Sequence, residues 1–134
     1  MPTVQVPAAI DPEAVAQARL GIPDQRILEL VVEAFGALSD QTRAKMLYAL
    51  VRRSLCVRDL ALTVGASESA VSHHLRLLRD RRLVRPVRRE GNQMEYRLDD
   101  HHLGALFQEA EYHADHVRSS LADHPYPEPP RTDP

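Results

Sequence analysis

The sequence predicts a mainly α-helical domain with one small β-hairpin, and three observations support this. The chain has 134 residues, enough for one hydrophobic core but not two. Aromatic residues make up only 4% and Trp is absent, which favours a helix-rich core of Leu, Val and Ala over an aromatic-rich β-sandwich. Several segments carry apolar residues at helical spacing, whereas only residues 84–98 show short extended runs around a turn.

The first half of the chain predicts an arm followed by two amphipathic helices. Residues 1–23 contain four prolines and are expected to form a partly disordered N-terminal arm, with one short helix that begins at Pro12. From Asp24 the run ILELVVEAFGAL carries apolar residues over a broad helical face, which predicts a buried or dimer-forming helix. Ser39 and Asp40 then offer capping side chains for the next helix, QTRAKMLYALVRR.

A helix-turn-helix pattern follows. The segment VRDLALTVG predicts a short helix that stops at Gly65, and ESAVSHHLRLLRDRRL predicts a longer helix directly after it. Two helices joined by a three- or four-residue turn with a glycine are typical of the helix-turn-helix motif. On the second helix Val71, Leu75 and Leu78 share one stripe, which we expect to face the core.

The next segment predicts a β-hairpin, after which the chain returns to helix. The runs VRPVRR and QMEYRL flank EGN, in which the Gly91-Asn92 pair suits a tight turn. Proline has no backbone N–H, so Pro86 places the first run at a sheet edge. A last helix is predicted from about Asp100 to Leu121.

This order of elements is that of a winged helix-turn-helix domain, which we assign to residues 24–121. Residues 122–134 contain five prolines and predict a disordered tail. No run approaches the roughly 18 apolar residues of a membrane span, and the N-terminus lacks a signal-peptide pattern. With one cysteine in the chain, we expect a cytoplasmic protein with no membrane partner.

Arginines are concentrated between His73 and Arg97. Eight arginines face three acidic residues there, a local balance of +5, whereas the rest of the chain carries −7 and the whole chain −2. Such segregation predicts a surface that meets an anionic partner, and its position on a helix-turn-helix and hairpin favours double-stranded DNA. The residues assigned to the DNA contact are Ser67, Ser69, Ser72, His73, His74, Arg76, Arg88 and Arg89.

Four of the seven histidines lie in residues 99–116, DDHHLGALFQEAEYHADH. His113 and His116 are three apart on a helix and can bind one ion together, while Asp100 at the helix cap can bend toward His102. Eleven residues separate His102 from His113, so the two pairs point the same way but lie about 16 Å apart. Because zinc ligands lie within about 2.2 Å of the ion, one helix cannot complete this site.

Two antiparallel copies of this helix can complete it. In a twofold homodimer formed by the N- and C-terminal helices, Asp100 and His102 of one subunit would meet His113 and His116 of the other, which creates the site twice. The apolar middle, LGALF with Ala110, is then the expected dimer seam. Three imidazoles and one carboxylate suit tetrahedral Zn²⁺ as the effector, with Co²⁺ second and Ni²⁺, which prefers six ligands, third.

These segments together resemble the ArsR/SmtB family of bacterial metal-sensing repressors. The similarity covers roughly residues 28–118 and is carried by FGALSDQTRAKMLYAL, LCVRDLA, SESAVSHHLRLLRDRRLV, REGNQMEYRL and the histidine-rich helix. The resemblance implies a homodimer that represses a metal-efflux or sequestration operon and leaves operator DNA when metal binds. The family's C-terminal-helix metal site maps onto the same four residues. It also implies a hydrogen bond from His113 to a backbone carbonyl near His73.

Some members of that family use a second site, in which a cysteine of the LCVRD segment joins ligands from the N-terminal arm. Cys56 and Asp59 match this motif, but the first 55 residues contain neither Cys nor His. We therefore expect a vestigial second metal site and a buried, structural Cys56. Similar nickel sensors recruit ligands from the N-terminus, and this arm, which begins MPT, has no histidine to offer.

Two alternatives remain open. A winged-helix regulator could sense a non-metal signal such as oxidation of Cys56, although a single cysteine acts only through an intermolecular disulfide or a sulfenic acid. A metal-dependent hydrolase would need an open metal position and an activated nucleophile or an HExxH motif, and the sequence offers neither. We therefore expect no enzyme activity and no protein substrate.

Overall fold

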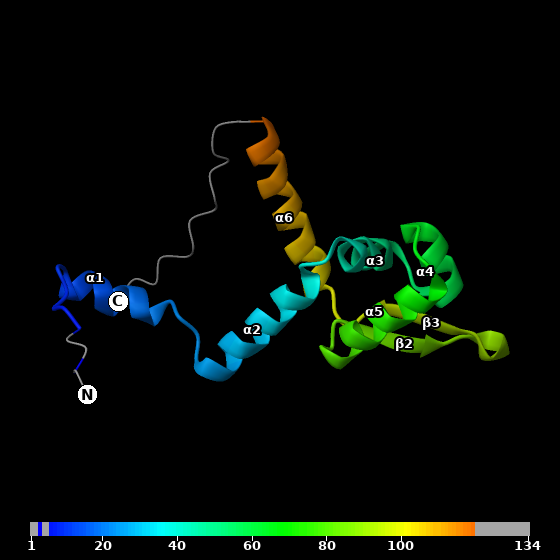
Figure 1. Ribbon diagram of the computed structural model, residues 1–134, viewed down its shortest axis with the longest axis horizontal. Helices are drawn as coiled ribbons and strands as arrows, with labels where there is room; N and C mark the ends of the chain where they lie inside the picture. Colours follow the sequence, from blue (N-terminus) through cyan, green and yellow to red (C-terminus); the bar gives the residue numbers. More distant parts are fainter. Residues whose placement is uncertain (1–2, 4–5, 120–134) are drawn as a thin grey trace.

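The computed structural model describes residue 3 and residues 6–119, and this part of the chain has the predicted winged helix-turn-helix order (Figure 1). The helices are α1 (Pro12–Leu20), α2 (Gln25–Leu38), α3 (Gln41–Arg52), α4 (Val57–Val64), α5 (Glu68–Asp80) and α6 (His102–Ser119). The strands are β1 (Leu55–Cys56), β2 (Val84–Arg88) and β3 (Met94–Leu98), with a short 3-10 turn at Glu90–Asn92. The predicted proline-rich tail, residues 122–134, lies outside the described residues.

Short polar side chains begin the helices where the sequence predicts them. Asp11, Asp24 and Asp40 each accept a hydrogen bond from a backbone N–H in the first turn of α1, α2 and α3, at 2.9 to 3.0 Å. Ser67 does the same for α5. At the other end of α4, Gly65 has φ +71°, a left-handed conformation that glycine adopts without strain and that ends the helix.

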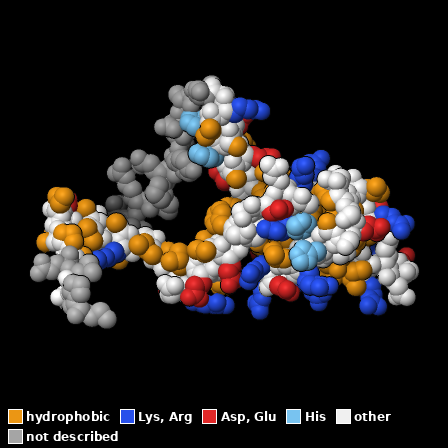
Figure 2. Space-filling view, in the orientation of Figure 1, with side chains coloured by type: hydrophobic (Ala, Val, Ile, Leu, Met, Phe, Trp, Pro, Cys, Tyr) orange, Lys and Arg blue, Asp and Glu red, His pale blue; other side chains and the backbone are white. Residues whose placement is uncertain are grey.

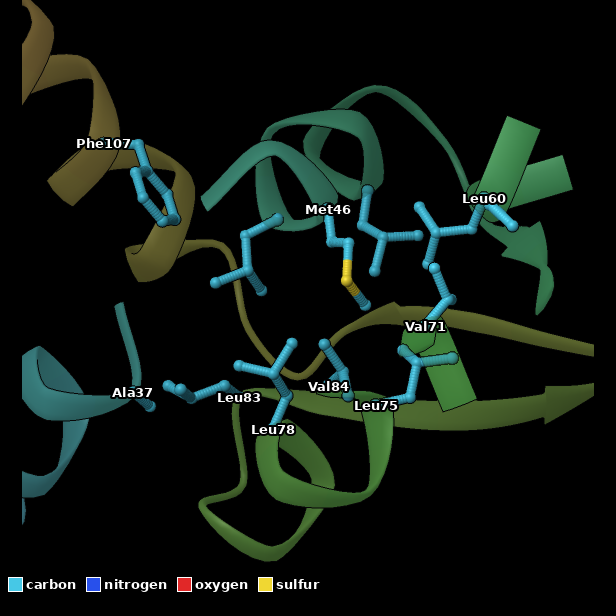
Figure 3. Close-up of a cluster of buried hydrophobic side chains, with 12 residues drawn as sticks. Ala37, Met46, Leu60, Val71, Leu75, Leu78, Leu83, Val84 and Phe107 are labelled. Carbon is cyan, nitrogen blue, oxygen red and sulfur yellow. The ribbon is translucent and has the colours of Figure 1, made fainter. Parts of the chain in front are cut away.

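The hydrophobic core lies between α3, α4, α5 and the sheet. Val71, Leu75 and Leu78 of α5 are buried, so the predicted inner stripe of this helix is confirmed. Figure 3 shows their side chains converging with those of α3 and α4. The largest fully buried side chains are Met46, Leu47, Leu60, Leu75, Leu78, Val71 and Val84. This core fixes α5, and therefore the surface that α5 presents, to the rest of the domain.

The sheet is antiparallel with the strand order β1-β3-β2, so β2 is an edge strand and the placement of Pro86 is confirmed. The sequence analysis missed β1, in which Leu55 pairs with Tyr96. The connection between β2 and β3 is also longer than the predicted tight turn. Gly91 and Asn92 both have positive φ, and the N–H of Arg89 donates to the carbonyl of Gln93 at 2.8 Å.

Helix α5 ends at Asp80, three residues before its predicted end. Arg82 takes a positive φ of 58°, and the N–H of Leu83 donates to the carbonyl of Leu78 at 2.9 Å. This turn folds Leu83 back into the core instead of leaving it on the helix surface. Burial of one leucine side chain contributes roughly 1.5–3 kcal/mol, which offsets the strain of a left-handed arginine.

Three helices extend away from this core in Figure 1. Helix α1 buries no residue, α2 buries only Ala37, and α6 buries only Phe107. Yet α2 and α6 carry large exposed apolar side chains, including Phe35, Leu106 and Val117. None of the described helices is long and apolar enough to cross a membrane.

Candidate DNA-binding and metal sites

One outward stripe of α5 carries most of the residues assigned to DNA. Ser69, Ser72, His73 and Arg76 follow the spacing i, i+3, i+4, i+7, and all four are exposed on the side opposite the buried stripe. Ser69, Ser72 and His73 lie on the N-terminal half of the helix, and Ser69 lies in its first turn, where the macrodipole favours a phosphate. The hydroxyl of Ser67 caps the helix by accepting from the N–H of Ala70, and its O–H remains available as a donor.

His74 differs from this group because its ring is turned toward the domain. It is half-buried, and its Nδ1 lies 3.5 Å from Nη1 of Arg43 on α3. The Nε of Arg43 donates to the carbonyl of Ala37 on α2 at 2.6 Å. The sequence analysis missed Arg43, which has no motif or spacing that links it to His74, 31 residues away.

The two wing arginines have different surroundings. Arg88 is exposed and has no ion pair among the described residues. Arg89 instead donates from Nε to Glu95 at 3.1 Å and from Nη2 to the hydroxyl of Ser54 at 3.0 Å. The hydrogen bond of Ser54 and the guanidinium of Arg89 lower the pKa of Glu95 below its usual value. Arg88 is therefore free to meet a phosphate, whereas Arg89 also links the wing to Ser54, which lies just before β1.

The predicted cationic surface is visible in Figure 2, where Lys and Arg side chains gather along the edge of the body formed by α5 and the strands. Of the described arginines in this region, several are exposed and lack an ion pair to any described residue: Arg76, Arg79, Arg82, Arg85, Arg88 and Arg97. No described acidic residue pairs with these charges, which leaves them available to bind a polyanion.

At the start of α6, Asp100 occupies the helix cap and lies beside His102, as the sequence predicts. Asp100 accepts from the backbone N–H of His102 at 2.8 Å, and the same oxygen lies 3.2 Å from Nδ1 of that imidazole. A carboxylate oxygen and an imidazole nitrogen are thus held together at the helix cap. The neighbouring His101 stacks its ring on that of His102, with centroids 4.1 Å apart.

His113 and His116 lie on the outer part of α6, where His113 is exposed and His116 half-buried. Within the described part of one chain, no group of three or more His, Cys, Asp or Glu side chains could hold a metal ion. The donor set of the two pairs together, three imidazoles and one carboxylate, fits zinc. The described residues contain no hydrogen bond between His113 and the backbone near His73, so any such link is not made within one chain.

The predicted dimer seam on α6 is wrong in part. Leu103 and Phe107 pack against the chain's own core, and Gly104 faces Val51. Phe107 stacks on Tyr48 with ring centroids 4.7 Å apart, and the Tyr48 hydroxyl donates to the Phe107 carbonyl at 3.4 Å. Burial beside α6, together with the nearby Glu111 carboxylate, raises the pKa of Tyr48. One face of this apolar segment therefore packs against the chain's own core. The other face, which carries Leu106, is exposed.

Cys56 is half-buried at the end of β1, not fully buried as expected. It occupies the N-cap position of α4 without a side-chain hydrogen bond to the helix. Asp59, three residues later, is exposed in the first turn of α4. No further Cys, His or acidic group joins them in a ligand cluster among the described residues.

The fold and the arginine-rich surface of α5 and the wing define a winged helix-turn-helix DNA-binding protein. Residues 40–85 match the model of the "Bacterial regulatory protein, arsR family". A cadmium resistance transcriptional regulatory protein CadC homolog of Staphylococcus aureus is 37% identical over 111 residues, which cover 82% of this chain and 90% of that protein. The chain belongs to the ArsR family of transcriptional regulators, and it is not an enzyme.

Further relatives agree with this assignment. A transcriptional repressor SmtB homolog of Synechocystis sp. is 47% identical over 90 residues, 67% of this chain and 65% of that protein. The homodimeric winged helix-turn-helix domain of Mb0332 from Mycobacterium bovis has a TM-score of 0.66 at 26% identity, covering 78% of this chain and 98% of that domain. The cadmium metal-sensor CMTR of Mycobacterium tuberculosis has a TM-score of 0.53 at 34% identity, covering 75% and 98%.

Proposed function

We propose that this protein is a cytoplasmic, metal-responsive repressor that binds operator DNA as a homodimer and is released when Zn²⁺, or Co²⁺ in its place, binds between the C-terminal helices. One observation carries the metal half of the proposal. His102, Leu106, Ala110, His113 and Val117 follow one another at intervals of three or four residues along α6. The ligands and the unpartnered apolar residues therefore share a single stripe.

That stripe has the right composition for a twofold contact with its own copy. Leu106 and Val117 are 36% and 65% exposed, although both are large and apolar. If two such stripes pack antiparallel, the start of each helix lies beside the end of the other. Asp100 and His102 then face the partner's His113 and the partner's His116. The four ligand pairs of the two chains together make two four-ligand sites.

The dimer is also supported by α2. This helix leaves Ile27, Leu30, Val31 and Phe35 exposed on one face while it buries only Ala37. Apolar faces of this kind are typical of obligate homodimer interfaces. The homodimeric domain of Mycobacterium bovis, which has the same fold, agrees with this arrangement.

The mechanism rests on a coupling free energy between the α6 stripe and α5. In the free dimer, the outward stripes of the two α5 helices would enter successive major grooves while Arg88 and its neighbours meet phosphates. Asp100, His102, the partner's His113 and the partner's His116 would hold the ion, which would then link the two α6 helices. Such coupling between metal and DNA binding is typically about 1–3 kcal/mol and is reciprocal.

The experiment is a zinc titration of the protein on a fluorescent duplex from its own upstream region, followed by anisotropy. About one zinc per subunit should release the DNA, with Co²⁺ acting similarly and Ni²⁺ more weakly. DNA binding that no metal alters would contradict the metal half of the proposal. It would shift attention to alkylation and oxidation of Cys56, whose effect on DNA release the same assay can measure.

A further inference from the structure

The helix that reads DNA is joined to the dimer-forming helix by very few contacts. Helix α2 buries one residue of its fourteen, Ala37, which lies at the edge of the core in Figure 3. Two arginines add polar links across this narrow junction. Arg43 bonds the carbonyl of Ala37 and approaches His74 of α5, and Arg81 at the end of α5 lies 3.9 Å from Glu33 of α2.

Of these links, that of Arg43 is the stronger. Arg43 is half-buried, its bond to the Ala37 carbonyl is short at 2.6 Å, and a charged donor to a buried carbonyl forms one of the stronger hydrogen bonds. The N–H of the same residue is fixed by Asp40, whose pKa this bond lowers. The Arg81–Glu33 pair is about half exposed, and exposed pairs contribute little.

We propose that Arg43 is a positioning residue that fixes the angle of the recognition helix α5 relative to the dimer helix α2, and so sets the half-site spacing that the dimer prefers. His74 is then the part of α5 that Arg43 holds, and the Arg81–Glu33 pair is a weaker second link. The inference rests on the proposed function only in that DNA is bound by a homodimer. It does not depend on metal.

The length of α5 makes the preferred half-site spacing sensitive to the angle between α5 and α2. Helix α5 has 13 residues and is about 20 Å long at 1.5 Å per residue. A change of about 10° at the α2–α5 junction would move the far end of the helix by roughly 3 Å, close to the rise of about 3.4 Å per base pair. Loss of the junction should therefore broaden the preferred spacing by about one base pair.

The test uses the Arg43→Lys variant of the full chain. Lysine keeps the charge but has no planar fork with which to bond the Ala37 carbonyl and His74 together. Arg26→Lys is the matched control, because Arg26 lies on α2 and, among the described residues, pairs with Glu29 of the same helix alone. DNA sites are selected from a random library with the wild-type chain. Metal-free affinities are then measured on duplexes whose half-site spacing is changed by one and two base pairs.

We expect the wild type and Arg26→Lys to prefer one spacing by about tenfold, which corresponds to about 1.4 kcal/mol. Arg43→Lys should bind the best site within a few-fold of wild type but discriminate between spacings by less than about threefold. Glu33→Gln, which removes the partner of Arg81, should flatten the preference in the same direction by a smaller amount. Light scattering checks that each variant remains a dimer.

A purely structural role for Arg43 would lower the affinity for all spacings by the same factor and keep the preference, and that result would overturn the proposal. An unchanged spacing preference in Arg43→Lys would overturn it too. If Arg43→Lys fails to fold, Arg43→Gln is measured in its place, and an unaltered spacing preference in that variant counts against the proposal. A wild type that binds DNA as a monomer, or not at all, would instead refute the proposed function.

Discussion

The two histidine-bearing helices of this protein, α5 and α6, differ in how much of each packs against the chain's own core. Helix α5 buries Val71, Leu75 and Leu78 in the core, and its opposite stripe of serines, His73 and Arg76 is exposed and fixed in place. Helix α6 is longer, but it buries only Phe107. Leu106, Val117 and the predicted ligands His102 and His113 are exposed on another face of this helix.

The difference indicates what each helix needs in order to act. The surface of α5 that we propose to read DNA is complete in a single chain, so dimerisation would only set its spacing. The metal half-sites that we propose on α6 are each incomplete, because two ligands cannot satisfy a tetrahedral ion. Metal binding should therefore depend on the dimer, whereas the fold of the reading helix should not. Each prediction below tests one side of this contrast.

The largest effect is expected from a substitution on the buried face of α5. Leu75→Ala removes a side chain that is 2% exposed and should lower the free energy of unfolding by about 2–5 kcal/mol. Leu106→Glu on the open face should leave the fold intact but place like charges across a twofold seam, and should weaken the dimer by about tenfold. Urea unfolding and sedimentation velocity measure the two effects. If both variants lost the same free energy of unfolding, the proposed difference between the buried face of α5 and the open face of α6 would be wrong.

The next effect concerns the coupling itself. His113→Ala should leave metal-free DNA affinity near that of the wild type but abolish zinc-induced release, a loss of about 5- to 150-fold in the metal effect. Gln108→Ala is the control, because Gln108 is an exposed residue of the same helix that is not an expected ligand. Anisotropy with and without zinc gives both values. Release by zinc from the His113 variant would show that the site is misassigned.

A smaller effect should separate the two wing arginines. Arg88→Ala removes a cation that has no ion pair among the described residues, so DNA affinity should fall on all sequences. The slope of log affinity against log salt should decrease by about 1.8, or about 0.9 for each subunit of the dimer. Arg89→Ala should change the salt slope less and lower the stability of the wing, because Arg89 is bonded to Glu95 and Ser54. A salt series on one duplex tests this, and identical slopes in the two variants would refute it.

The smallest effect should appear in the pH dependence of stability. The pKa of Glu95 is lowered in the folded chain by Ser54 and Arg89, so its carboxylate stabilises the fold above the ordinary pKa of a glutamate. That contribution is lost as the pH falls through the lowered value. Wild type should be more stable than Glu95→Gln near pH 7, and the difference should disappear in acid. A difference that grows on acidification would have the wrong sign.

Most elements were predictable from the sequence because their signals are local. The caps Asp24 and Asp40, the stop at Gly65 and the inner stripe of α5 each occupy the predicted place. Strand β1 was missed because two residues cannot show an alternating pattern, and it forms only where Leu55 meets Tyr96. The early end of α5 was missed because no glycine stands at Arg82 to signal a left-handed turn.

The candidate sites were predictable only as far as helical spacing determines them. Spacing placed the α6 ligands on one stripe, but it could not divide the apolar middle between the chain's own core and a partner. That division depends on Tyr48 and Val51, which are distant in sequence and pack against Phe107 and Gly104. Helical spacing likewise could not predict the contact between Arg43 and His74.

The central claim is that the metal site is shared between two subunits, and mixing of two inactive variants tests it most directly. One variant carries Asp100→Ala and His102→Ala, and the other carries His113→Ala and His116→Ala. Neither homodimer should bind zinc tightly. After exchange of subunits in an equal mixture, half of the dimers should be mixed and hold one intact site each, or about one zinc per four chains. A mixture that recovers no zinc binding, or a parent homodimer that binds one zinc per chain, would contradict the account.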